Sequence, residues 1–441
     1  MREIPFERSL PCAADRSHTR TGLRRAMAVA AVACSLVALA ACADDSSNAS
    51  GSTGSTSSAP TGKDLLGPTD VAKGTPVKIG QLTEGETPTV DASDEIPSGA
   101  ATAEWLNQHR GGIGGHPIEM VTCEMKTDPA VAADCANKMV QEGVIAVALP
   151  QSAYAEAVWK PLHDAGIPLV SINAFGKEME TDATSTFITA NPSATFFGLP
   201  ISLAKSTGAK KVAFVVIDVP QAIEIVDADH GRTMAKAGLD YDIVKVPLGT
   251  PDMVPQMQQV ASSGAGVVHI LGNDSFCIAA LKGLKAVGYT GAISAVSYCF
   301  TDATRAALGA DLKGINVLSL FADGALDDPT YQQYLQVMQA YGHGIKEVSG
   351  PYALSGYAVV ATVGAMLHQL KGDPTASTAA ETIRSMPETD LPAGGGVKIK
   401  CGGSAVPDKP AICTNQWLRA QLDAKGEPGD YTVEDSSDVL G

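Results

Sequence analysis

The stretch ATAEWLNQHRGGIGGHPIEMVTCEMKTDPAVAADCANKMVQEGVIAVALP, residues 101–150, decides the fold. It reads as the end of a helix, a glycine-rich turn, a strand at 118–122, a helix at 129–142 and a strand at 144–149. The second of these strands is apolar throughout, as expected of a parallel strand that is covered on both faces. Strands separated by a helix of this length predict a βαβ unit.

The same alternation continues on both sides of this stretch. Strand-like runs lie at 77–82, 118–122, 144–149, 167–172, 211–217, 242–247, 266–271 and 315–320. Helix-like runs lie at 99–109, 129–142, 153–165, 193–206, 221–237, 252–263, 276–287, 329–342 and 352–371. These strand and helix runs make too many βαβ units for one sheet, and their alternation breaks near 185–195. The sequence therefore predicts an α/β protein with two doubly wound, Rossmann-like lobes.

Several motifs resemble the extracytoplasmic substrate-binding proteins of ABC transporters, specifically the branched-chain amino-acid-binding type. The most specific are Gly111-Gly112-Ile113 with Gly115, and Asp128-Pro129 at the start of the next helix. KVAFVVID at 211–218 and SGYAVVATVGAMLHQL at 355–370 are similar to later parts of that family. The resemblance covers nearly all of residues 76–425.

The resemblance implies the type I periplasmic binding protein fold, with two lobes joined by three crossovers. Lobe one would combine residues 76–191 with 325–392, and lobe two would combine 192–324 with 393–436. A ligand would bind between the lobes, because open α/β sheets bind ligands beyond the carboxyl ends of their strands. Closure about the crossovers would then produce the form that a transporter recognises.

The amino-terminal segment predicts export and lipid anchoring. Arg20, Arg24 and Arg25 precede an apolar run at 26–41, which ends in Leu39-Ala40-Ala41-Cys42. About 16 apolar residues are too few for a comfortable membrane span, which needs ~20, but they suit a signal peptide. The arrangement resembles a bacterial lipobox, which predicts a signal peptide at 1–41, lipidation of Cys42 and attachment to the outer face of the cytoplasmic membrane. Residues 43–62 are rich in Ser, Gly and Thr and predict a flexible tether, so that 42–75 would be anchor and tether and order would begin near Pro76.

The charge and the cysteines narrow the class of protein further. The chain carries a formal net charge of −16, and without the leader, which is net +3, the charge is near −19. Such acidity argues against nucleic acid as a partner. Apart from Cys12, Cys34 and Cys42, six of the nine cysteines remain, in the couples Cys123 and Cys135, Cys277 and Cys299, and Cys401 and Cys413. Outside the cytoplasm an even number indicates disulfides; six cysteines permit 15 connectivities, of which pairing between neighbours is our hypothesis.

The resemblance places five candidate ligand contacts in lobe one. Ser152 follows the third strand, where family members supply hydroxyls to a ligand carboxylate, but it also suits an N-cap for a helix from Ala153. Tyr154 is either a ligand contact or a packing residue. Phe175 stands where the family has Thr or Ser, which argues against an ordinary α-amino acid and favours an apolar or aromatic group, with Asn173 as a polar contact. Glu84, in the loop after the first strand, is the fifth candidate.

Four further candidates follow strands of lobe two. They are Asn273, Asp274, Phe276 and Tyr298, in loops that often carry Tyr and an acid in the family. Asp274 could equally cap the helix at 276–287, and Phe276 could belong to the core. The predicted pair Cys277 and Cys299 would hold two of these loops together.

Three functions compete at this stage. The leading one is a monomeric, lipid-anchored protein that binds a small polar or amphipathic solute and delivers it to an ABC permease. The alternative is a sensory module that presents its closed form to a membrane receptor or kinase. An enzyme is disfavoured, because the chain has no G-x-S-x-G, H-E-x-x-H or P-loop motif and its histidines are scattered; His269, in an apolar strand, is expected to be a hydrogen-bonded core residue. We expect no cofactor and no metal.

Overall fold

The computed structural model describes residues 63–436, with the exception of 88–89, 219–229, 248 and 407. The predicted signal peptide, Cys42 and the tether up to residue 62 lie outside the described residues, as does the first half of the helix expected at 221–237.

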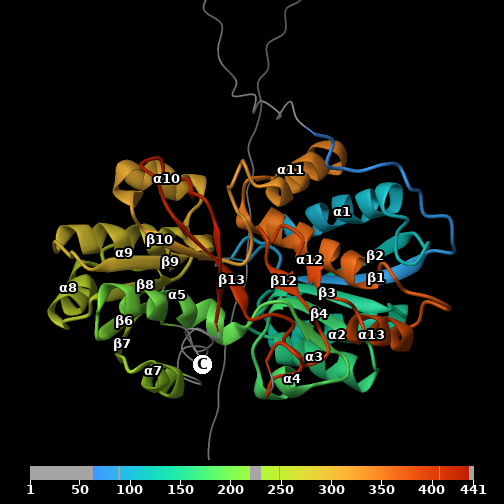
Figure 1. Ribbon diagram of the computed structural model, residues 1–441, viewed down its shortest axis with the longest axis horizontal. Coiled ribbons are helices and arrows are strands. Elements are labelled where there is room, and N and C mark those ends of the chain that lie inside the picture. The colour runs from blue at the N-terminus through green and yellow to red at the C-terminus, as the bar shows by residue number, and fades with distance from the viewer. Residues whose placement is uncertain (1–62, 88–89, 219–229, 248, 407, 437–441) are drawn as a thin grey trace, which may run out of the picture. The chain divides into compact units, whose positions relative to one another are not determined.

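The first sheet contains five parallel strands in the order β2-β1-β3-β4-β5 (Figure 1). Their bounds are β1 Val77–Thr83, β2 Ile118–Glu124, β3 Ala146–Gln151, β4 Leu169–Asn173 and β5 Thr186–Ile188. After β2 the chain crosses to the other side of β1 and adds β3, β4 and β5 there. This reversal makes a topological switch point between β1 and β3, which is where doubly wound sheets bind ligands.

Helices cover both faces of this sheet. On one face α1 Glu95–His109, α11 Pro329–Tyr341, α12 Pro351–Leu367 and α13 Ala376–Arg384 share a core with Ile79, Ala146 and Ile172. On the other face α2 Pro129–Glu142 and α3 Ala155–Asp164 pack on Val147 and Leu149, and α4 Lys177–Thr181 adds Met179. The adjacent strand residues Ala146 and Val147 thus serve opposite faces, as the alternation of a buried parallel strand requires.

Local chemistry explains the segment that decides the fold. Asp128 accepts hydrogen bonds from the backbone N–H groups of Ala130 and Val131 and caps α2, Pro129 occupies its first position, and Gly143 ends it with φ +67°. Gly112 has φ +64°, and a Cβ there would lie 2.1 Å from the carbonyl oxygen of His116. Only glycine fits this turn between α1 and β2.

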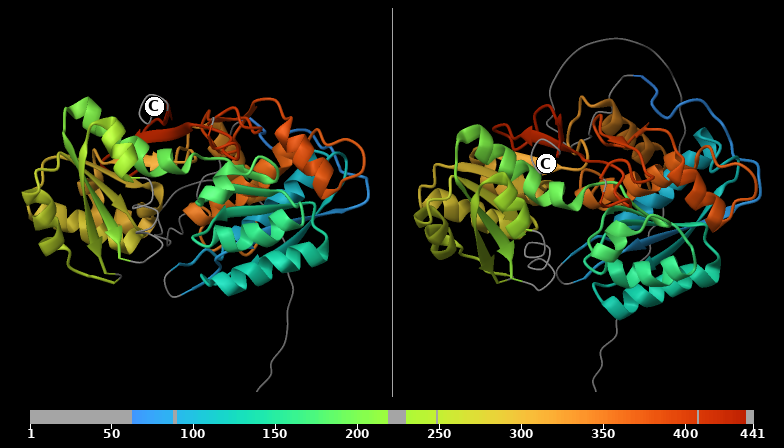
Figure 2. Two further views of the ribbon diagram at one scale, coloured as in Figure 1. Left: turned by 90° about the horizontal axis from the view of Figure 1, so that it is seen from below. Right: turned by 60° about the horizontal axis from the view of Figure 1, so that its bottom comes forward.

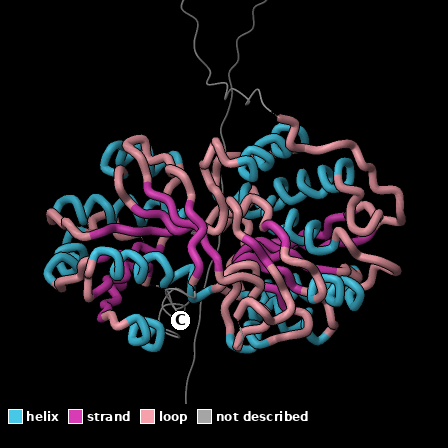
Figure 3. Tube along the Cα trace, viewed as in Figure 1, coloured by secondary structure: helices cyan, strands magenta, loops and turns pink. Residues whose placement is uncertain are grey.

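The second sheet contains seven strands in the order β14-β13-β10-β9-β8-β6-β7. Strands β6 Lys211–Ile217, β7 Asp240–Val246, β8 Val267–Leu271, β9 Ala292–Val296 and β10 Asn316–Ser319 are parallel, and β13 Gln416–Gln421 and β14 Thr432–Asp435 are antiparallel additions. The order reverses again, between β6 and β8. Figure 3 shows helices flanking the strands of both sheets.

Two separate clusters cover the faces of the second sheet. Helices α8 Val254–Ser262, α9 Asp274–Ala286 and α10 Asp302–Leu308 contribute to one, with Val215 and Ile270. Helices α5 Pro192–Thr207 and α7 His230–Ala237 contribute to the other, with Phe214 and Trp417. Figure 2 shows α5 beside this sheet from two further directions.

The chain passes between the sheets three times. The passages follow β5, β10 and the small hairpin of β11 Thr389–Asp390 and β12 Lys398–Ile399. Ala411 and Ile412 pack in the core with β3 and β4, and Cys413 N–H donates to the Ile188 carbonyl. This packing favours a boundary for the second segment of lobe two nearer to β13 than residue 393; the division into lobes remains a prediction.

The structure joins the six cysteines as the couples proposed from the sequence. Cys123 bonds to Cys135, Cys277 to Cys299, and Cys401 to Cys413. The first disulfide ties β2 to α2, the second ties α9 to the 3-10 turn at Ser297–Cys299, and the third closes the loop after β12. Each therefore fixes a connection beside a sheet.

Ordered structure begins earlier than the sequence analysis expects. Residues 63–75, which we call the strap, already pack along α1 and α11, so the expected start near Pro76 is too late. Trp105 Nε1 donates to the Leu66 carbonyl at 3.0 Å, and Leu66 packs against the core of the first sheet. His109 lies 2.9 Å from the Gly67 carbonyl through Nδ1. The residues that bind the strap are distant in sequence, so composition alone gave no sign of it.

Removing residues 1–75 should destabilise the protein relative to removal of residues 1–62, by about 1–3 kcal/mol, because several hydrogen bonds to the strap and the burial of Leu66 are lost. Urea denaturation of the two truncated chains measures the difference. Trp105→Phe in the longer chain removes only the indole N–H bond to Leu66 and keeps an aromatic side chain, so it should reproduce part of the loss. Equal stability of the two chains would show that the strap does not contribute.

Candidate functional site

Two predicted contacts meet at the switch point of the first sheet. Glu84 follows β1 and Ser152 follows β3, and the Ser152 hydroxyl donates to Glu84 Oε1 at 2.5 Å. The other oxygen, Oε2, accepts the backbone N–H of Thr127 at 2.9 Å. Burial raises the pKa of Glu84, and these two hydrogen bonds oppose that rise. The carboxyl edge of this sheet therefore carries a hydrogen-bonded carboxylate of the chain itself.

The structure changes the role expected of Ser152. Helix α3 begins at Ala155 rather than Ala153, and Tyr154, not Ser152, stands at its N-cap position. Ser152 is 4% exposed, and its oxygen accepts the N–H of Tyr154 at 3.0 Å. Tyr154 itself is half-buried against the core of α2 and α3.

A second carboxyl group, which the sequence analysis missed, lies beside the first. Glu95, in the first turn of α1, is 3% exposed and accepts hydrogen bonds from Thr83 Oγ1 at 2.5 Å and from Ser355 Oγ at 2.9 Å. Burial raises its pKa to about 8, and the nearby charge of Glu84 adds to the rise. The only sequence signal was an acidic residue at the start of a helix, and the first turn of a helix accepts such a residue for ordinary reasons.

Asn173 and Phe175 follow the fourth strand as expected. Asn173 is 1% exposed, and neither atom of its side-chain amide has a hydrogen-bond partner. It is paired in register with Gln151, the residue before Ser152. The Phe175 ring packs on Phe196 of α5 with 5.1 Å between centroids. Phe175 therefore joins the end of β4 to a helix of the second sheet.

The four candidates after the strands of the second sheet have separate roles. Asn273, not Asp274, caps α9 by accepting the N–H of Phe276 at 3.1 Å. Asp274 accepts the Thr301 hydroxyl at 3.0 Å. Phe276 is 4% exposed and packs in the core with α8 and α9, which favours the core role over contact with a ligand. Tyr298 is half-buried at the end of β9.

Tyr298 also connects the two sheets. Its ring lies 5.6 Å from that of Tyr352, in the first turn of α12, centroid to centroid. Burial raises the pKa of Tyr352, and the charges of Glu95, Asp274 and Glu84 raise it further. Tyr352 is another residue that the sequence analysis missed. Its hydroxyl feels the charge of Glu84, beside the first sheet, and of Asp274, beside the second.

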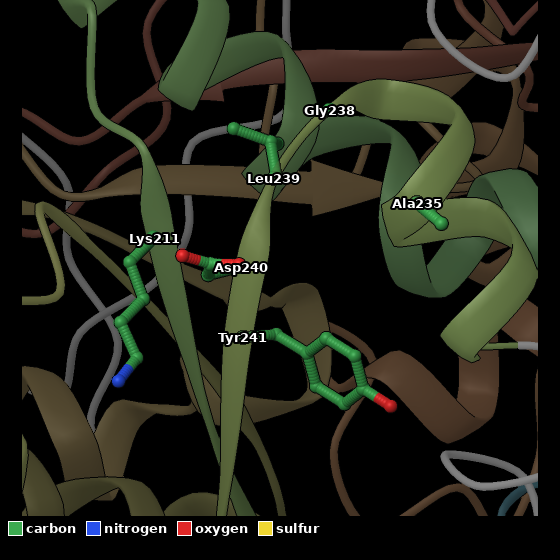
Figure 4. A pocket seen from close by; sticks show the side chains of 6 residues that line it. All are labelled: Lys211, Ala235, Gly238, Leu239, Asp240 and Tyr241. Carbon is green, nitrogen blue, oxygen red and sulfur yellow. The ribbon is translucent and has the colours of Figure 1, made fainter.

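One cavity among the described residues lies away from this edge. It has a volume of about 600 Å³ and is lined by residues that include Lys211, Asp240 and Tyr241 (Figure 4). Lys211 and Asp240 begin β6 and β7, so this cavity lies at the amino ends of those strands. Ligand sites of open α/β sheets lie at the opposite edge, and we assign this cavity no role.

Within the described part of the chain, no three His, Cys, Asp or Glu side chains are grouped as a metal site would require. His269 is fully buried in β8, its Nδ1 lies 2.8 Å from Ser294 Oγ, and burial lowers its pKa to about 3. It is the hydrogen-bonded core histidine that the sequence predicts. Among the described residues, no helix has both the length and the apolar character for a membrane crossing.

Comparison with known proteins agrees with this architecture. The model of the family described as "Periplasmic binding protein" matches residues 76–412. The chain belongs to this family. Periplasmic binding proteins bind solutes outside the cytoplasm, so the chain is an extracytoplasmic solute-binding protein with the type I fold.

Individual relatives are distant in sequence. "Leu/Ile/Val-binding protein homolog 6" of Brucella suis is 26% identical over 344 residues, which span 74% of this chain and 83% of the relative. The substrate-binding protein LivJ of Streptococcus pneumoniae, solved with isoleucine, aligns with a TM-score of 0.63 at 17% identity, over 82% of this chain and 100% of its own. A solute-binding protein of R. palustris, solved with 4-hydroxybenzoate, aligns with a TM-score of 0.64 at 20% identity, over 82% of this chain and 97% of its own. At these identities the two structures support the fold and leave the ligand of this chain open.

Glu95→Gln should reduce the dependence of stability on pH. Because the folded chain holds the Glu95 proton up to pH about 8 and the unfolded chain releases it above about 4.5, the wild-type free energy of unfolding should fall as pH rises through this window. The fall attributable to Glu95 is about 3–5 kcal/mol, at ~1.4 kcal/mol per pKa unit. Urea denaturation at pH 5, 6.5 and 8 measures it, with the exposed Glu381→Gln as control. If wild type and Glu95→Gln change equally with pH, Glu95 is ionised in the folded protein.

Proposed function

We propose that this periplasmic binding protein captures a small polar or amphipathic solute between its two lobes and delivers it to an ABC permease. The observation that carries the proposal is the concentration of buried polar and aromatic side chains at the carboxyl edges of both sheets. Glu84 and Ser152 lie at the switch point of the first sheet, and Asp274 follows β8 at the switch point of the second. Tyr298 and Tyr352 bring the two edges into contact.

Three chain passages between the sheets support closure of the lobes about the solute. Such passages act as hinges when a few residues absorb the change in backbone angles. Two aromatic contacts join elements of the two sheets: Tyr298 with Tyr352, and Phe175 with Phe196. Closure of the lobes would keep or rearrange them. What the relatives bind, isoleucine and 4-hydroxybenzoate, suggests a solute of similar size.

Solute binding is tested by thermal unfolding of the purified chain against amino acids, amides, amines, aromatic acids and sugars. A solute at 100 times its dissociation constant should stabilise the protein by about 2.7 kcal/mol. For a hit, Ser152→Ala should abolish part of the shift, whereas Ser262→Ala, on the exposed face of α8, should not. A panel in which no compound shifts the unfolding temperature would contradict the proposed function.

We also propose that Cys42 carries a lipid that holds the protein at the outer face of the cytoplasmic membrane. The apolar run at 26–41 and the small residues before Cys42 support this anchor. Because the strap is bound to α1 and α11, the predicted tether of residues 43–62 would join the folded part beside these helices.

Cys42→Ala should move the protein from the membrane fraction to the soluble fraction, because the thiol that accepts the lipid is lost. Fractionation of expressing cells followed by immunodetection measures this, with Cys34→Ala, within the predicted signal peptide, as the control. Retention of Cys42→Ala in the membrane fraction would contradict the anchor.

A further inference from the structure

Four hydrogen-bond donors at the carboxyl edge of the first sheet are already committed to carboxyl groups of the chain. The Ser152 hydroxyl and the Thr127 N–H donate to Glu84. The hydroxyls of Thr83 and Ser355 donate to Glu95. A solute carboxylate that reached this edge would find acceptors of its own kind and no free hydroxyl among these four donors.

No basic side chain balances these carboxyl groups. In the described residues, neither Glu84 nor Glu95 has a Lys, Arg or His nitrogen within 4.0 Å. Two cations of neighbouring loops have other partners: Lys126 is paired with Glu124, and Lys346 is paired with Glu86 at 3.2 Å and with Asp91 at 2.8 Å. A half-buried or buried carboxylate without a counter-ion is costly, and a cationic ligand would remove that cost.

Aromatic rings stand beside these carboxylates. Tyr298 and Tyr352 are half-buried, tilted at 53° to each other, and close enough to Glu95 for its charge to act on both hydroxyls. Faces of aromatic rings attract ammonium groups, and the attraction grows when the cation is desolvated. Two tyrosine rings in the electrostatic reach of carboxyl groups therefore favour a positively charged group.

Asn173 supplies an independent sign of a missing ligand. Its amide is almost fully buried, and both its oxygen and its nitrogen lack partners. Buried polar groups without partners are rare and need an explanation. Asn173 ends β4 next to the end of β3, the strand that Ser152 follows, so its amide belongs to the same edge as Glu84. A polar solute at this edge would give the amide a partner, and the amide oxygen can accept from an ammonium group.

We propose that the solute is a small organic cation, an amine or guanidine without a free carboxylate, held by Glu84 and Glu95 against the rings of Tyr298 and Tyr352. The proposal rests on the proposed function and names the solute class for the same site. The site would select an amine over an acid partly by repelling carboxylates. Glu84 already accepts the Ser152 hydroxyl and the Thr127 N–H, which a solute carboxylate would need. A cation also favours the ionised form of Glu95, which otherwise retains its proton near neutral pH.

The test compares amines with the amino acids and acids of the same skeleton. Titration calorimetry on the purified full-length chain compares two sets of amine, amino acid and acid: isoamylamine, leucine and 4-methylpentanoate, and tyramine, tyrosine and 3-(4-hydroxyphenyl)propanoate. A third set compares agmatine with arginine. At least one amine should bind, and it should bind at least tenfold more tightly than its amino acid, while the acids should not bind. An amino acid or acid that binds as tightly as its amine overturns the proposal.

Variants then locate the charge effect. Glu84→Gln and Glu95→Gln should each weaken the bound amine at least tenfold, whereas the exposed Glu381→Gln on α13 should leave it unchanged. Glu84→Gln should also narrow the preference for amine over acid, because the Ser152 hydroxyl is no longer held by a charge. If both Gln variants fold, by circular dichroism, and bind the amine as tightly as wild type, the proposal is overturned.

Failure of this inference can be told from failure of the proposed function. If no amine binds but another compound in the thermal panel does, the solute class is wrong and the solute-binding function stands. If no compound of either set binds, both are wrong.

Discussion

The arrangement of the site depends on the reversal of strand order beside the first strand of each sheet. Because β2 lies on one side of β1 and β3 on the other, the connections after β1 and β3 leave in opposite directions and open the carboxyl edge between them. Glu84 and Ser152 meet in that opening. The second sheet repeats the reversal between β6 and β8, so that Asp274 follows β8 at the equivalent place. The same constraint that makes the sheets doubly wound therefore decides which loops can reach a solute.

The fold was predictable from the sequence because its signals are local and repeat. An apolar run such as 211–217 must be a covered strand, and Asp128-Pro129 with Gly143 marks both ends of α2. Several of the elements that were missed are short: β5 has three residues, α4 has five, and β11 and β12 have two each. The longer α13, with nine residues, and β13, with six, were missed as well. The strap was missed for another reason, since its bonds to α1 and α11 depend on partners far away in the chain. The disulfide pairing was open on the sequence alone and is decided by the proximity of β2 to α2 and of α9 to the turn after β9.

The site was predicted less completely than the fold. Position after a strand made Glu84 and Ser152 candidates but could not show that they bind each other, because that contact joins residues 68 positions apart. Whether Asn273 or Asp274 caps α9 depends on the residue at which the helix begins, and a difference of one residue decides it. Glu95 and Tyr352 lie in first turns of helices, where an acid or an aromatic residue has ordinary explanations, and only their burial and proximity reveal them. Sequence position thus points to the edge at which we propose that a solute binds, and tertiary contacts determine the chemistry of that edge.

If the proposed cation is the solute, the carboxyl pair accounts for the change of ligand charge on an unchanged backbone. A carboxyl edge with free hydroxyl and N–H donors suits an anion, because the donors are unpaired until the ligand arrives. In this chain hydroxyl and N–H donors of this edge are paired with Glu84 and Glu95, and the proposed cation would bind where an anion would otherwise find those donors. Burial outweighs the hydrogen bonds at both carboxyl groups, since it raises the pKa of Glu84 and raises that of Glu95 to about 8. Glu95 is a buried acid at the edge where the family binds solutes, and its burial lowers the stability of the fold. A residue that is kept at such a cost is expected to serve recognition.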